Sequence, residues 1–291
     1  MRCVGNGLIW SNGQLIIFVN LQCPPIIRKS REPTMELTER CEHSTEVKTP
    51  LSEIRSREWL DYFTRNIQHL LDVPWHLGRE LSDEDVDAIS ASVQGFQLGE
   101  SSEGKHLVRC AKMHSETTCD PDYYDAIKLF IREEQRHACD LARFLDLNGI
   151  PTVKAAWPDS VFRFLRRGAG LELSIAVLVT AEIIAEVYYP ALQAATNSVV
   201  LKAVCDQIIQ DETPHVQFQC ERLAILRSRR SWLGGFMTYA AQRFLFFGTC
   251  FVVWMKHGPV FRRAGQGFRT FWKTAWEDYH VAESIMRRTP N

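Results

Sequence analysis

The chain has 291 residues, 45% of them hydrophobic, and its 34 Lys and Arg residues nearly balance its 35 Asp and Glu residues. This length and apolar content are sufficient for a large buried core, and the near-zero net charge argues against nucleic acid as an obligatory partner. The nine cysteines are scattered and contain no C-x-x-C pair, which argues against zinc-ribbon and rubredoxin-type sites. We therefore expect reduced thiols and a cytoplasmic protein.

Residues 1–50 differ from the rest of the chain, and we expect them to form a poorly structured N-terminal extension. Two apolar runs within residues 8–21 surround Asn12-Gly13, a pattern that predicts a β-hairpin. Asn, Gly and Gln interrupt the apolar residues, which is atypical of a signal peptide. Because a more ordinary sequence begins at Met35, the pattern leaves open whether residues 1–34 belong to the native protein.

Residues 51–230 show the periodicity of an α-helical bundle. Apolar residues recur every three or four positions over 51–71, which predicts a lead-in helix before Pro74. A capping Ser followed by acids at 82–85 predicts the start of one long helix over about 83–115. Residues 150–169 are too many for a tight turn and predict a crossover connection. The remaining bundle helices are expected over about 122–147, 170–195 and 198–229.

Residues 231–291 are expected to add C-terminal helices that pack on the bundle. The segment 232–255 is apolar and long enough to cross a bilayer, but Gln242 and Arg243 divide it into runs that are too short. We therefore favour a buried helix or one that forms a homodimer, with association with a membrane surface as the alternative. A last amphipathic helix is expected over about 260–286.

The strongest chemical signal is a Glu-x-x-His pattern that occurs twice. Glu134 and His137 are three positions apart, so both side chains lie on one helical face, which they share with apolar residues. Glu212 and His215 repeat this arrangement in a later predicted helix. Two carboxylate–imidazole pairs that both face a core predict a metal site.

Each pair follows a predicted helix that carries a single inward-facing glutamate. Glu182 lies in the middle of an apolar helix, where a carboxylate is costly unless it is paired, protonated or bound to metal. Glu100 lies on the apolar stripe of the first helix, and Glu103, one turn further on, is its alternative. Glu186 is either an extra ligand or a hydrogen-bond partner of a ligating histidine.

Together these residues match a known ligand pattern for two metal ions in a helical bundle. A Glu from each of two helices and a Glu-x-x-His from each of the other two is the set found in di-iron and di-manganese proteins. Four carboxylates balance the charge of two divalent ions, and oxygen-rich sites favour iron or manganese. We predict two iron ions, with a Mn/Fe pair or two Mn ions as alternatives, and no catalytic residue beyond the ligands. The predicted ligands are Glu100, Glu134, His137, Glu182, Glu212 and His215.

Three residues beside the motifs carry further expectations. Glu133 and Asp211 each precede a motif glutamate, and we expect them to cap a helix or pair with Arg and not to touch metal. Pro214 lies inside the second motif and cannot donate a helical hydrogen bond, which predicts a kinked or bulged helix beside the site.

Two segments resemble the motifs of rubrerythrins. Residues 99–104, Gly-Glu-Ser-Ser-Glu-Gly, resemble their first-helix segment, and residues 133–138, Glu-Glu-Gln-Arg-His-Ala, resemble their second-helix motif. The resemblance covers about residues 83–229 and implies a ferritin-like four-helix bundle of the di-iron carboxylate superfamily. It also implies that Glu134 and Glu212 bridge the two metals, that each histidine binds one of them, and that the other two glutamates are terminal ligands.

This resemblance implies an oxidoreductase that uses dioxygen or peroxide to oxidise a substrate, which the sequence does not identify. An external electron donor would be needed, because the chain contains no flavin or iron–sulfur motif. The alternative is an iron-binding ferroxidase or storage protein without an organic substrate. The missing rubredoxin-like cysteine pair argues against a complete rubrerythrin peroxidase, and the additional C-terminal helices argue against a minimal ferritin subunit.

Overall fold

The computed structural model describes residues 8–11, 14–17, 51–101, 104–154, 170–228 and 230–288. The chain divides into two compact units, Met1–Thr34 and Met35–Asn291. In the first unit, strands β1 (Leu8–Ser11) and β2 (Gln14–Ile17) pair antiparallel, with Leu8 opposite Ile17 and Ser11 opposite Gln14. This register confirms the hairpin that the sequence predicts.

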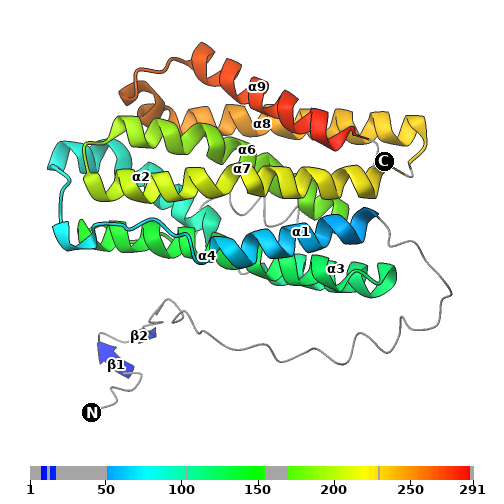
Figure 1. Cartoon of the computed structure of the whole chain (residues 1–291). Helices are drawn as coiled ribbons and strands as arrows, with labels where there is room; N and C mark the ends of the chain where they lie inside the picture. The colour runs from blue at the N-terminus through cyan, green and yellow to red at the C-terminus, as the bar shows by residue number, and fades with distance from the viewer. Residues whose placement is uncertain are drawn as a thin grey trace. The chain divides into compact units, whose positions relative to one another are not determined.

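The described part of the second unit is an all-α helical bundle, which confirms the predicted fold class (Figure 1). Helices α2, α4, α7 and α8 begin with a side-chain cap, such as the capping box in which the Ser82 hydroxyl accepts from Asp85 N while the Asp85 carboxylate accepts from Ser82 N. The described helices are α1 (Leu51–Asn66), the 3-10 helix η1 (Trp75–Leu77), α2 (Asp83–Glu100), α3 (Lys105–Thr118), α4 (Pro121–Leu147), α6 (Leu171–Ala195), α7 (Val199–Arg227), α8 (Trp232–Arg263) and α9 (Phe268–Met286).

The helices are arranged around the central pair α6 and α7. Helix α4 packs against α1, α2, α3 and α7, while α8 and α9 cover α6 and α7 on the side away from α4 (Figure 1). Helix α6 is therefore enclosed on several sides, which agrees with its apolar sequence and with its long run of buried residues. The interior of this bundle holds the predicted ligands.

The single helix predicted over 83–115 is wrong, because the structure divides it into α2 and α3. Gly104, with φ +61°, precedes α3, and a Cβ atom built there would lie 2.6 Å from Ile131 Cδ1. Only glycine adopts this backbone without strain while α4 approaches so closely. The break places Glu100 at the last residue of α2.

Other helix boundaries also differ from the predictions. Helix α1 ends at Asn66 and not near residue 71, while α8 continues through Pro259 to Arg263. The turn at Gly265, with φ +75°, delays the start of the last helix to Phe268. The predicted crossover over 150–169 falls mostly on residues 155–169, which lie outside the described residues.

The prediction that all the cysteines are reduced is wrong, because a described cysteine forms a disulfide. Cys119, which follows α3 in a left-handed conformation, is disulfide-bonded. Sequence spacing alone does not reveal pairs between distant cysteines. The described cysteines that are not disulfide-bonded are Cys110, Cys139, Cys205, Cys220 and Cys250.

Candidate metal centre

The structure brings all six predicted ligands together in the interior of the bundle. Their side chains form two overlapping groups, and within each group one potential ligand atom per residue lies within 4.8 Å of the others. Glu134 belongs to both groups. The larger group is Glu134, Glu182, Glu212 and His215, and the smaller is Glu100, Glu134 and His137.

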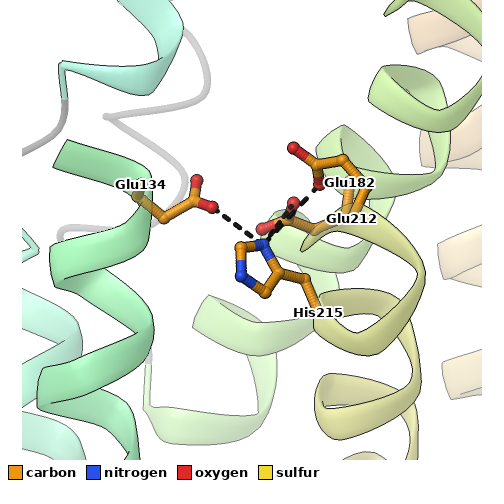
Figure 2. Close-up of side chains that lie close together, drawn as sticks. All are labelled: Glu134, Glu182, Glu212 and His215. Atoms are coloured by element: carbon orange, nitrogen blue, oxygen red, sulfur yellow. Dashed lines mark ion pairs between the residues drawn. The ribbon is translucent and has the colours of Figure 1, made fainter. Parts of the chain in front are cut away.

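The larger group is centred on one nitrogen of the His215 ring. Figure 2 shows the three carboxylates turned toward Nδ1, with Glu134 from α4 on one side and Glu182 and Glu212 from α6 and α7 on the other. Nδ1 lies 3.0 Å from Glu134 Oε1, 3.8 Å from Glu212 Oε2 and 3.9 Å from Glu182 Oε2. Three carboxylate oxygens and one imidazole nitrogen around a single point are a donor set for a divalent ion.

The smaller group also has carboxylates that approach the Nδ1 atom of a histidine, here His137. Nδ1 of His137 lies 3.8 Å from Glu134 Oε1 and 3.7 Å from Glu212 Oε1. Glu134 and Glu212 therefore approach both imidazoles, whereas Glu100 joins only the His137 group and Glu182 only the His215 group. Glu134 and Glu212 therefore lie between the two histidines, and each histidine has one further glutamate beside it.

The facing atoms of this cluster have no hydrogen-bond partners. Both imidazole Nδ1 atoms, Glu134 Oε1, Glu182 Oε1 and both carboxylate oxygens of Glu212 are buried and make no hydrogen bond. Leaving a buried polar atom without a partner costs about 1–3 kcal/mol, and more when the atom is charged. The concentration of such atoms at one point indicates that these residues could hold metal ions.

A carboxylate from the other motif helix lies behind each imidazole. His137 Nε2, on α4, is 3.0 Å from Asp211 Oδ2 on α7, and His215 Nε2, on α7, is 2.9 Å from Glu133 Oε2 on α4. An ionised carboxylate accepts a hydrogen bond, so each pair places the ring proton on Nε2. In the neutral form of each ring the lone pair is then on Nδ1, which faces the cluster.

One asparagine joins the two supporting carboxylates. Nδ2 of Asn66, at the end of α1, donates to Glu133 Oε1 and to Asp211 Oδ1, both at 2.8 Å. Gln207 Nε2 donates to Asp211 Oδ2 at 3.0 Å, and Arg136 forms an ion pair with the same oxygen. Asn66 and Gln207 were not predicted from the sequence, in which the only sign of these supporting residues is the acid that directly precedes each motif glutamate.

Glu100 is held by a tyrosine from another helix. The Tyr189 hydroxyl, on α6, donates to Glu100 Oε1 at 2.6 Å. Burial and the neighbouring Glu100 carboxylate raise the pKa of Tyr189 well above its usual range, so the phenol keeps its proton and remains a donor. This contact fixes a carboxylate that occupies the last residue of α2.

The cluster concentrates buried carboxylates, which positive charge would stabilise. Burial, together with the neighbouring acid Glu134, raises the pKa of Glu100 and of Glu182 well above the usual value. Burial also raises the pKa of Glu212, to about 7, although its contacts with Glu182 and His215 oppose the shift. At Glu134, the histidines outweigh the effect of burial and lower the pKa. Either protons or a cation would relieve the repulsion among these acids.

The structure agrees with only some of the expectations for the other residues near the predicted ligands. Glu186 accepts from Thr213 Oγ1 at 2.8 Å, belongs to neither group and makes no hydrogen bond to a histidine, so neither role expected for it is seen. Glu103 lies outside the described residues. Asp211 pairs with Arg136 as expected, whereas Glu133 bonds to His215. Pro214 lies within α7 without interrupting the helix.

Comparisons of the chain with protein-family models, with curated proteins and with solved structures find no match. A functional interpretation therefore rests on the residues of this chain and on their geometry.

Proposed function

We propose that this protein is a dimetal carboxylate oxidoreductase of the ferritin-like type, which holds two iron ions and uses dioxygen or peroxide to oxidise a substrate. The observation that carries the proposal is the pair of overlapping ligand groups that share Glu134. A single structural ion needs only one such group. Two groups with a common carboxylate fit a pair of ions that lie close together.

The total charge of the ligands and the types of their donor atoms both fit two divalent ions. Glu134 and Glu212 would contact both ions, with Glu100 and His137 completing one position and Glu182 and His215 the other. The four carboxylates equal the charge of two divalent ions, and a set with four oxygen ligands and two imidazoles suits iron or manganese. When bound, two redox-active ions would supply the electrons that reduce dioxygen or peroxide.

The residues of the chain would keep this centre ordered and dry. Asp211 and Glu133 hold the proton of each imidazole on Nε2, which keeps Nδ1 directed at the metal positions. Phe63 and Phe130 lie beside the His215 ring, with centroid distances of 6.0 and 4.7 Å, and limit the access of water from that side. Both histidine side chains are fully buried. A centre shielded in this way protects reactive species from solvent.

The proposal is tested by anaerobic titration with ferrous ion, followed by exposure to oxygen and measurement of oxygen consumption. We expect the wild type to bind two ions per chain and to consume oxygen, and Glu134→Ala to lose both properties because Glu134 belongs to both groups. Glu186→Gln is the matched control, because this half-buried carboxylate lies one turn from Glu182 but outside both groups.

Three results would contradict the proposal. Equal iron binding by the wild type and Glu134→Ala would exclude the cluster as the metal site. Binding of one ion per chain would exclude a dimetal centre. Uptake of many ions per chain in a large hollow assembly, seen by light scattering, would replace the oxidoreductase with the storage alternative.

A further inference from the structure

One face of α8 exposes an unusual amount of apolar surface. Half of the exposed large hydrophobic side chains among the described residues belong to this one helix, including Trp232 at 83% exposure and Phe244 at 79%. Soluble monomers rarely show such a continuous apolar strip, and one usually marks an interaction site. We call it the α8 apolar face, and its main residues are Trp232, Phe236, Met237, Phe244, Phe251 and Met255.

The opposite face of α8 is anchored to the bundle. Phe246 and Cys250 are fully buried, and Arg243 Nη2 pairs with Glu283 Oε2 of α9 at 2.6 Å. His257 Nδ1 lies 2.8 Å from the Ser92 hydroxyl of α2. The helix is long and apolar enough to cross a membrane. Crossing would break these contacts, so the structure favours a helix that lies along a surface.

The charge around α8 is strongly one-sided. Between Glu221 and Glu277 the sequence contains ten Lys and Arg residues and no Asp or Glu. Some of these cations pair with acids of the bundle, such as Arg230 with Glu172 and Arg263 with Asp85. Exposed basic side chains lie at the end of α8 and at the start of α9, namely Lys256, Arg262 and Arg269.

This combination decides between two occupants of the face. The apolar residues Met237, Phe244 and Phe251 are spaced seven apart, which would suit pairing with a second copy of α8. Self-pairing would bring together two cationic helices that carry no acidic side chain, however, and like charges oppose such contact. A bilayer with anionic headgroups accepts both the aromatic residues and the flanking cations.

We propose that the α8 apolar face binds the surface of a membrane that contains anionic phospholipids, with the helix lying in the plane of the interface. Aromatic and aliphatic side chains would enter the boundary between headgroups and acyl chains, while Lys256, Arg262 and Arg269 contact the phosphates. This surface is independent of the metal centre, so the two proposals fail separately.

The test is flotation of the full-length protein with vesicles of phosphatidylcholine, with or without phosphatidylglycerol. We expect binding to the anionic vesicles that weakens as salt is raised. Phe244→Asp combined with Phe251→Asp should abolish flotation. Arg262→Glu combined with Arg269→Glu should weaken it at least roughly twentyfold, because each basic residue near an anionic surface contributes about fivefold in affinity.

Matched controls separate the face from general effects of charge. Leu77→Asp combined with Met113→Asp introduces the same two charges at exposed apolar positions of η1 and α3 and should leave flotation unchanged. Lys112→Glu combined with Arg132→Glu makes the same reversal of charge at exposed positions of α3 and α4, and this variant should still bind the anionic vesicles. Circular dichroism checks that each variant is folded.

Two results would overturn the proposal. The first is failure of the folded wild type to float with either vesicle. The second is a stable dimer, seen by light scattering, that the Phe244 and Phe251 substitutions dissociate while vesicle binding is absent, which would make the face a homodimer interface.

Discussion

The two halves of the candidate metal centre use the same residue types but are held in different ways. In the half formed by α6 and α7, Glu182 lies in the middle of an unbroken helix. In the half formed by α2 and α4, Glu100 is the last residue of α2, and the Tyr189 hydroxyl holds its carboxylate. A continuous helix is enough to position Glu182, whereas Glu100 at the end of its helix also depends on a contact with another helix.

The supporting contacts are more symmetric than the ligands. Each imidazole is bonded by a carboxylate from the opposite motif helix, and Asn66 joins the two carboxylates. The two ligand groups are therefore joined through their supporting residues as well as through Glu134. Changes in this layer should affect both halves, while changes at Glu100 or Glu182 should affect one.

The largest effect expected for one half alone is the loss of its ion. Glu182→Ala removes a ligand of the His215 group only, and Glu100→Ala removes a ligand of the His137 group only. We expect each variant to bind one ferrous ion where the wild type binds two, as measured by anaerobic titration. Loss of both ions in either variant would show that the halves do not fill independently.

The next largest effect is expected from Asn66→Ala. Without this amide, both Glu133 and Asp211 lose a donor, and loss of such a supporting contact typically weakens metal binding by about 10–100-fold. We expect both ions to bind more weakly, as followed by competition with a chelator. Thr64→Ala, an exposed position on the same helix, is the control. Weakening of only one ion would contradict the coupling of the two halves.

A smaller effect is expected at the break between α2 and α3. Gly104→Ala places a methyl group where it collides with Ile131 and forces a left-handed backbone on alanine, which should lower the free energy of unfolding by about 2 kcal/mol. Denaturant unfolding measures this change.

Gly99→Ala is its matched control. It lies within α2 with open space around the new methyl group, so stability should stay the same or increase. Equal effects of the two substitutions would show that the break does not need glycine.

The smallest effect is expected from Tyr189→Phe. Loss of one hydrogen bond to Glu100 should weaken the ion of the His137 half by roughly fivefold, the equivalent of about 1 kcal/mol, and leave the other ion unchanged. Tyr188→Phe is the control, because that hydroxyl contacts Ser92 at 2.8 Å and no ligand of the cluster. Equal weakening of both ions would contradict a contact that serves only one half.

Local patterns predicted much of the bundle, but they failed where distant segments meet. The Ser82 capping box and the Asn148-Gly149 end of α4 could be read directly, because caps and turns depend on a few neighbouring residues. The need for glycine at the Gly104 break could not, because it depends on the approach of Ile131 from α4. Asn66 was missed for a similar reason, since nothing in α1 indicates that its amide reaches two carboxylates on other helices.

The sequence by itself determined the all-α bundle and the six residues that the interior would bring together. Helical periodicity fixes which face each residue occupies, and Glu-x-x-His needs only one helix to place both side chains on one face. The tertiary structure alone decided that Glu134 and Glu212 approach both imidazoles, that each ring is bonded from the opposite helix, and that Tyr189 holds Glu100. These relations depend on how the helices are positioned against one another, which no single helical pattern encodes.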